Sequence, residues 1–162
     1  MRGKVVSVNV SKRKGVPKVP VPEAEFREEW GLVGDVHAGP GERQVSLLAL
    51  EAIERQREVL RGKVCPKAGT FEIGPGSFAE NLTIEGLPLA ELPVGTRLKV
   101  GEVLLEITRI GKECHVGCAI YKLLGNCVMP KEGVFARVLK GGKVRPGMEV
   151  VVYEGRRAHD KR

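Results

Sequence analysis

Apolar and polar residues alternate in several short stretches of the chain, which is the pattern of β-strands buried on one face. Residues 5–10 show this pattern near the N-terminus. Residues 97–100 and 102–107 show it on both sides of a glycine, and this arrangement predicts a hairpin. Residues 143–147 predict a turn that leads into a further strand at 149–153.

Two other stretches carry apolar residues at helical spacing. A helix is predicted from Ser46 to about Leu60, because apolar residues recur along one face and Ser46 is a suitable N-cap. Its start would leave free backbone N–H groups near residues 43–46.

A second, shorter helix is predicted from Pro130, since proline suits the first turn of a helix and the pair of glycines at 141–142 would end it. Its inward-facing residues would be Val134, Val138 and Leu139. Phe135 is also expected in the core.

The chain contains 21 glycines and 10 prolines, and such frequent turn-forming residues favour short strands over long helices. A parallel sheet would need more intervening helices than the sequence offers. The 162 residues suit one domain. We therefore expect a mainly β fold, barrel-like, with two decorating helices, a core at about 3–152 and a basic tail at 154–162.

The net charge of +7 is concentrated at the ends of the chain. Residues 1–18 contain six Lys or Arg and no acid, whereas residues 19–153 contain 17 basic and 18 acidic groups. A basic stripe with stacking aromatics, which nucleic-acid binding would need, is therefore not expected. The basic loop at 11–24 is expected to be long and mobile.

The apolar runs are too short to span a bilayer, and the basic N-terminal residues are not followed by the apolar region of a secretory signal. We expect a soluble, cytoplasmic protein without membrane contact. Its oligomeric state is not predicted.

Three of the four cysteines, Cys114, Cys118 and Cys127, lie within fourteen residues that also contain His115. Cytosolic thiols are normally reduced, so the cysteine cluster indicates metal binding or thiolate reactivity rather than a disulfide. The spacing is not that of two paired zinc ligands, although a structural zinc site remains open. Buried free cysteines that pack as small apolar residues are the other alternative.

Several motifs occur in the order in which they occur in the MOSC domain family, named after the C-terminal domain of molybdenum-cofactor sulfurase. They are residues 31–39 (GLVGDVHAG), 43–48 (RQVSLL), 76–87 (GSFAENLTIEGL), 111–120 (GKECHVGCAI) and 125–142 (GNCVMPKEGVFARVLKGG). The chain resembles a small stand-alone member of that family over nearly its whole length.

The resemblance implies a β-barrel-like fold that binds the molybdenum cofactor, a pterin with a dithiolene that holds molybdenum and with a terminal phosphate. In relatives that reduce N-oxygenated compounds, a cysteine of a Cys-x-x-Cys pair ligates the metal. The corresponding pair here has three intervening residues. Cys118 is the first choice for the reactive thiolate and metal ligand, Cys114 the second, and Cys127 a third candidate for the thiolate.

The resemblance also implies a polar, cationic pocket for the phosphate and the pterin. Arg43 beside Gln44 and Ser46, at the predicted helix start, would offer a bidentate fork and free N–H groups. Lys18 in the mobile loop would close over the phosphate, and Glu80 and Asn81 would suit the pterin edge. Asp35 and His37 are cofactor contacts or ordinary loop residues.

Three functions follow as alternatives. The first is a protein that carries or sulfurates the cofactor through a reactive cysteine. It would depend on a separate cysteine desulfurase or a recipient molybdoenzyme, because no pyridoxal-phosphate site is visible in the sequence. The second is a small molybdenum-dependent reductase of N-hydroxylated compounds. The third is a non-enzymatic β module, stabilised by zinc or binding through its basic arm.

Overall fold

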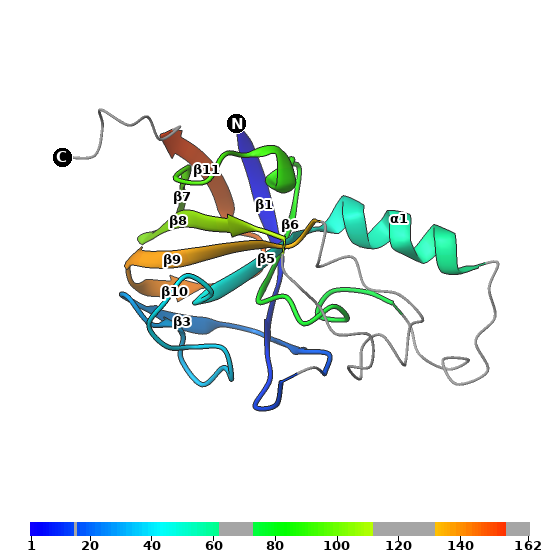
Figure 1. Ribbon diagram of the computed structural model, residues 1–162, viewed down its shortest axis with the longest axis horizontal. Coiled ribbons are helices and arrows are strands. Elements are labelled where there is room, and N and C mark those ends of the chain that lie inside the picture. Colours follow the sequence, from blue (N-terminus) through cyan, green and yellow to red (C-terminus); the bar gives the residue numbers. More distant parts are fainter. Residues whose placement is uncertain (15, 62–72, 112–131, 155–162) are drawn as a thin grey trace.

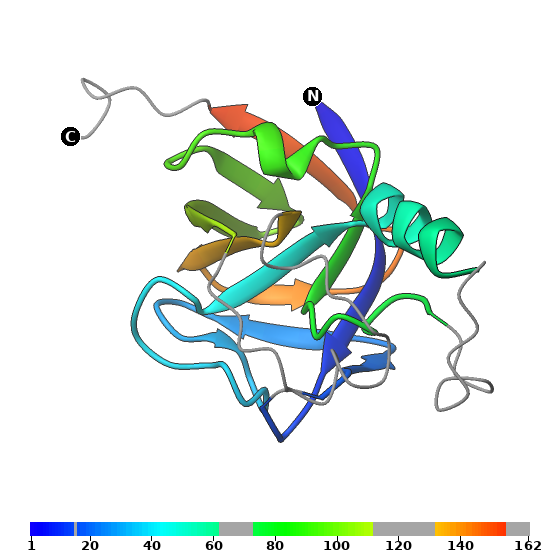
Figure 2. The ribbon, with the colours of Figure 1, turned by 45° about the vertical axis from the view of Figure 1, so that its right-hand side comes forward.

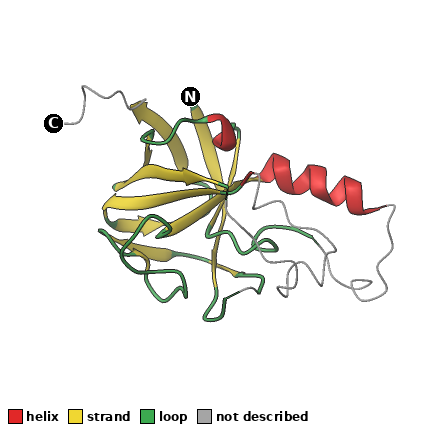
Figure 3. Cartoon of the chain, in the orientation of Figure 1, coloured by secondary structure: helices red, strands yellow, loops and turns green. Residues whose placement is uncertain are grey.

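The computed structural model describes residues 1–14, 16–61, 73–111 and 132–154. Strands dominate these parts of the chain (Figure 3). The strands are β1 (Arg2–Val10), β2 (Val19–Val21), β3 (Ala24–Arg27), β4 (Gly31–Leu32), β5 (Val45–Ala49), β6 (Leu82–Glu85), β7 (Arg97–Val100), β8 (Val103–Ile110), β9 (Val134–Lys140), β10 (Gly142–Val144) and β11 (Glu149–Glu154). The helical elements of the described residues are α1 (Leu50–Arg61) and a short 3₁₀ helix, η2 (Leu89–Glu91).

Seven strands close into a barrel. Their order is β11-β7-β8-β9-β5-β6-β1, and pairing of β1 with β11 completes the ring, while β2 pairs with residues 8–10 at the end of β1. Strands β5 and β6 are parallel, and the other pairings are antiparallel. Figure 2 shows the strands arranged around a common centre. The predicted barrel-like β fold is confirmed.

The core fills the inside of this ring, because alternate residues of each strand point inward. Val5 and Val8 of β1, Leu47 of β5, Leu82 of β6 and Ile107 of β8 are buried there. Burial of each such side chain stabilises the fold by roughly 1.5–3 kcal/mol. The predicted strand at 5–10, the hairpin at 97–107 and the strand at 149–153 therefore correspond to β1, β7 with β8, and β11.

The helix predicted from Ser46 begins four residues later, at Leu50. Residues 45–49 form β5 instead, in register with β6 on one side and β9 on the other. Leu47 faces the barrel core, and Leu48 is buried on the opposite face. Residues buried on both faces suit a strand in the middle of a sheet. The helix α1 contacts β5 and β6 and extends away from the barrel (Figure 1).

The second predicted helix is wrong over Val134–Lys140, because these residues form strand β9. Val134 and Val138 are four residues apart, and this spacing places both residues on one face of a helix or of a strand. Ala136 is also in the core, so every second residue of this stretch faces inward, which is the repeat of a strand. Phe135, between two inward residues, is buried on the outer face.

The first two residues of the turn predicted at 143–147 belong instead to strand β10, which forms a separate three-stranded sheet with β3 and β4. The loop expected at 11–24 contains β2, which pairs with β1. Within the described parts of the chain, no helix is long and apolar enough to cross a membrane.

Candidate functional site

Small polar side chains alternate with the core residues on three adjacent strands and point out of the barrel. We call this set the outer polar layer; its members are Ser7, Asn9, Ser46, Glu80, Asn81 and Thr83. All of them are buried. They lie on or beside β1, β5 and β6, and each has at least one hydrogen bond within the protein.

Ser46 and Asn81 bind one another at the centre of this layer. The Asn81 Oδ1 accepts from the Ser46 backbone N–H at 2.9 Å and from its hydroxyl at 3.2 Å. The Asn81 backbone N–H donates to the Ser46 carbonyl at 2.9 Å. Ser46 is thus not a helix cap, because its polar groups join β5 to the residue that precedes β6.

Asn9 ties the same region to β1. Its amide group donates to the Glu80 carbonyl at 3.1 Å and to the Thr83 hydroxyl at 3.2 Å, and its Oδ1 accepts from Ser7 at 2.6 Å. The Asn81 amide returns a hydrogen bond to the Asn9 carbonyl at 3.2 Å. Sequence reasoning missed Asn9, Ser7 and Thr83 because alternation with valine or leucine predicts exposed polar residues.

Glu80 is fully buried within the layer. Its Oε2 accepts from the Thr83 hydroxyl at 2.6 Å and from the Gly76 N–H at 2.9 Å, whereas Oε1 has no partner among the described residues. Burial raises the pKa of the Glu80 carboxyl, although these hydrogen bonds act in the opposite direction.

The segment at 74–80 covers the layer and has an unusual backbone. Ala79 has a φ of 64° and Gly76 a φ of 87°. A Cβ at Gly76 would lie 2.3 Å from the Lys18 carbonyl oxygen, and the Lys18 N–H donates to the Gly76 carbonyl at 2.8 Å. The cover is therefore held directly against the segment that carries Lys18.

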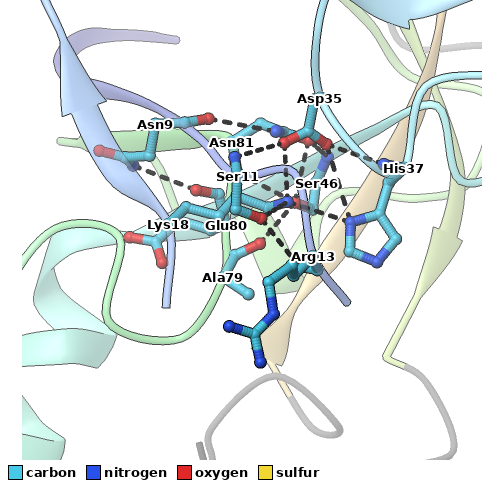
Figure 4. A network of polar contacts seen from close by, with 10 residues as sticks. All are labelled: Asn9, Ser11, Arg13, Lys18, Asp35, His37, Ser46, Ala79, Glu80 and Asn81. Atoms are coloured by element: carbon cyan, nitrogen blue, oxygen red, sulfur yellow. Dashed lines mark hydrogen bonds and ion pairs between the residues drawn. The ribbon is translucent and has the colours of Figure 1, made fainter. Parts of the chain in front are cut away.

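Lys18 is not a mobile surface residue, because its side chain and that of Asp35 are both fully buried and form an ion pair at 2.8 Å (Figure 4). The Asp35 carboxylate also accepts from the backbone N–H groups of Ser11 at 3.0 Å and His37 at 3.1 Å. Burial by itself raises the pKa of Asp35, but hydrogen bonding with His37, Lys18 and Ser11 and the Lys18 charge hold it well below its usual range.

His37 lies at the edge of this buried pair. Its Nδ1 is 3.0 Å from the Lys18 Nζ, and about a third of its side chain is exposed (32%). In Figure 4 the Arg13 guanidinium also extends away from the buried network. An imidazole and exposed cations therefore border the network, whose carboxylate and ammonium neutralise one another.

Gln44 and Arg43 precede β5, and their side chains contact different residues of β9. The Gln44 Oε1 accepts from the Val138 N–H at 2.9 Å, so this buried amide continues the pairing of β5 with β9. Arg43 is exposed, with its guanidinium carbon 5.6 Å from the centre of the Phe135 ring. The expected helix start near these residues is wrong, since α1 begins at Leu50.

The candidate thiolates Cys114, Cys118 and Cys127 lie outside the described residues. The described residues on either side of that segment, Gly111 and Gly133, are joined by a backbone hydrogen bond of 2.6 Å. They follow β8 and precede β9, and β9 pairs with the strand that carries Ser46. Among the described residues, no group of three or more His, Cys, Asp or Glu is placed to hold a metal ion.

The structure thus brings together six of the predicted site residues in one polar region, namely Lys18, Asp35, His37, Ser46, Glu80 and Asn81 (Figure 4). Ser46, Glu80 and Asn81 form the buried layer, and Lys18 and Asp35 form a neutral pair beside it. Among the predicted site residues that the structure describes, His37 and Arg43 have exposed side-chain surface, and Arg43 lies over the Phe135 ring. Chemically, this arrangement offers hydrogen-bond donors and positive charge above a rigid polar wall.

The fold resembles that of several solved structures. YuaD from Bacillus subtilis superposes with a TM-score of 0.71 at 18% identity, over 93% of this chain and 94% of that one. YiiM from Geobacillus stearothermophilus superposes with a TM-score of 0.70 at 22% identity, over 94% of this chain and 75% of that one. YiiM from Escherichia coli superposes with a TM-score of 0.63 at 22% identity, over 93% of this chain and 70% of that one. No curated protein matches the chain.

A family comparison extends this likeness of fold to the sequence. The model of the MOSC domain matches residues 33–151, which include Asp35, His37, Arg43, Ser46 and Asn81. The match covers more than half of the chain, and the chain therefore belongs to the MOSC domain family.

Proposed function

We propose that this protein binds the molybdenum cofactor over the outer polar layer of β1, β5 and β6, and that it carries or sulfurates the cofactor through a cysteine thiolate. The MOSC family is associated with this cofactor. The observation that carries the proposal is the gathering of the motif residues Asp35, His37, Ser46, Glu80 and Asn81 with Lys18 in one largely buried polar network (Figure 4).

The exposed residues at this site suit the anionic end of the cofactor. A phosphate needs positive charge and fixed N–H donors. Arg43 offers an exposed guanidinium, and His37 offers a partly exposed imidazole. Lys12, Arg13 and Lys14 are exposed on the neighbouring loop and form no ion pair with other described residues. We assign the phosphate to this cationic side.

The buried residues have a supporting role in the proposal. Ser46 and Asn81 already satisfy one another, and Lys18 and Asp35 are paired, so we assign these four to the wall that fixes the site. Gln44 belongs to the same group through its bond to β9. Glu80 Oε1 has no partner among the described residues, and it is the acceptor that we assign to an N–H group at the pterin edge.

The cysteines complete the proposed chemistry. A thiolate is a soft ligand that suits molybdenum, and it is also the form that accepts or holds a transferable sulfur. Cys118 remains our first choice, followed by Cys114 and Cys127. When bound, the cofactor would supply the metal centre that receives sulfur. We expect a cysteine desulfurase as the sulfur donor and a molybdoenzyme as the recipient.

Elemental analysis and pterin fluorescence of protein produced in a host that makes the cofactor test this proposal. We expect molybdenum and pterin in equal amounts, and their loss when Cys114, Cys118 and Cys127 are all replaced by serine. Unchanged cofactor content in the triple variant would exclude the thiolate role. Stoichiometric zinc without molybdenum would exclude the proposed function as a whole.

A further inference from the structure

The Lys18 ammonium lies within hydrogen-bond distance of three acceptor atoms. Asp35 Oδ1 lies 2.8 Å away, His37 Nδ1 3.0 Å and Ser11 Oγ 3.3 Å (Figure 4). The Ser11 hydroxyl in turn donates to the Arg13 carbonyl at 3.1 Å, which leaves its oxygen free to accept from Lys18. Because an ammonium group can only donate, each of these contacts requires the partner atom to accept, His37 Nδ1 included.

This requirement fixes the tautomer of His37. An ammonium group has no lone pair, so a contact at 3.0 Å requires the lone pair of Nδ1, and the ring proton of a neutral imidazole must then be on Nε2. The opposite tautomer would direct an N–H toward the Lys18 ammonium. The Asp35 Oδ2 atom is 3.7 Å from Nδ1, farther away than the Lys18 Nζ at 3.0 Å, so the shorter contact of Nδ1 is the one with Lys18.

The surrounding contacts leave Lys18 little freedom to move. The backbone N–H of Lys18 donates to Gly76, and the Asp35 carboxylate is held by the backbone N–H groups of Ser11 and His37. Both charged side chains are fully buried, whereas His37 is partly exposed. The ring nitrogen that does not face Lys18 is therefore the one available to a ligand.

We propose that Lys18 is a positioning residue, which holds His37 as the Nε2–H tautomer so that this N–H can donate to an oxyanion of the bound ligand. Lys18 itself does not reach the ligand. The inference relies on the proposed function only for the identity of that ligand, because the tautomer is a property of the unliganded protein. It also replaces the expectation that Lys18 closes over a phosphate.

Long-range ¹H–¹⁵N NMR of the histidine rings in the full-length, unliganded protein tests this inference. The spectrum is recorded at alkaline pH, where unperturbed histidines are neutral, and His37→Gln assigns the signal. We expect a single tautomer, with Nδ1 unprotonated and Nε2 protonated. A protonated Nδ1, or a mixture of tautomers, in the wild-type protein would overturn the inference.

A charge-balanced variant separates the effect of Lys18 from that of the fold. Lys18→Met with Asp35→Asn removes both buried charges, and we expect His37 to become a mixture of tautomers. The matched control is Lys143→Met with Glu23→Gln, an exposed pair at 3.9 Å, which should leave the His37 signal unchanged. An unchanged tautomer ratio in the Lys18 variant would overturn the role of Lys18. The wild-type spectrum tests the tautomer even if that variant does not fold, and none of these spectra depends on cofactor binding.

Discussion

Asn81 and Ser46 are joined by hydrogen bonds in both directions, with the Asn81 side chain accepting from Ser46 and the Asn81 backbone donating to it. These bonds fix the end of the covering segment at 74–80 to β5. They also place Asn81 where its amide reaches the Asn9 carbonyl on β1. One side chain therefore connects three strands of the barrel.

Asn81→Ala is expected to lower the free energy of unfolding by about 3 kcal/mol, because it leaves the Ser46 N–H and the Asn9 carbonyl without these partners in a buried region. Ser46→Ala keeps the backbone bonds and should cost only about 1 kcal/mol. Urea unfolding of the two variants measures the difference. Equal losses would show that the Asn81 side chain has no special connecting role.

Lys18→Met is expected to destabilise the protein by about 3–5 kcal/mol, because it leaves the Asp35 carboxylate buried without its counter-ion. Adding Asp35→Asn should recover a large part of this loss, since no unpaired charge then remains. Lys143→Met at the exposed pair with Glu23 should change stability by less than about 1 kcal/mol. A double variant no more stable than Lys18→Met would contradict this account.

Gly76→Ala and Gly34→Ala form a matched pair. Both glycines have a positive φ, of 87° and 91°, so alanine at either position carries a backbone cost of roughly 1–2 kcal/mol. Only at Gly76 would the new Cβ meet another backbone atom, the Lys18 oxygen, whereas nothing lies within 4 Å at Gly34. Thermal unfolding should therefore show a clearly larger loss for Gly76→Ala, and similar losses would be evidence against the tight contact.

The buried Asp35 predicts a pH dependence of stability. Its pKa is lower in the folded protein than in the unfolded chain, where an aspartate has a pKa of about 3.9. Between the folded and the unfolded pKa of Asp35, the unfolded chain binds more protons than the folded protein. The contribution of Asp35 to the free energy of unfolding is therefore complete above about pH 4 and is lost as the pH falls further. The stability advantage of wild type over Lys18→Met/Asp35→Asn should shrink in that range. An advantage that is constant with pH would refute this.

Local patterns in the sequence were sufficient for several strands. The alternation at 5–10 predicted β1, and the strand expected after the turn at 143–147 corresponds to β11. The same reasoning failed for 45–49, which is buried on both faces and lacks alternation, and for 134–140, where a spacing of four suits helix and strand equally. In both cases the neighbouring strands decide the structure.

The motif residues of the site could be chosen from the sequence, but their roles could not. Lys18 is buried because Asp35, seventeen residues away, supplies its counter-charge, and nothing in the local sequence shows that pairing. Asn9 is buried where its amide donates to the carbonyl of Glu80, 71 residues away in the sequence. Roles that depend on such distant contacts require the three-dimensional structure.

The measurement that tests the central claim most directly is the molybdenum and pterin content of His37→Gln, Arg43→Gln and Arg145→Gln beside wild type, all produced in a cofactor-making host. His37 lies at the edge of the buried network, and Arg43 is exposed just before β5, the strand that carries Ser46, whereas Arg145 is exposed and lies near Glu23, outside the network. Loss of one charge-assisted contact should weaken cofactor binding by about tenfold. We predict reduced content in the first two variants and wild-type content in Arg145→Gln; the same content in all three variants would contradict the placement of the cofactor on this face.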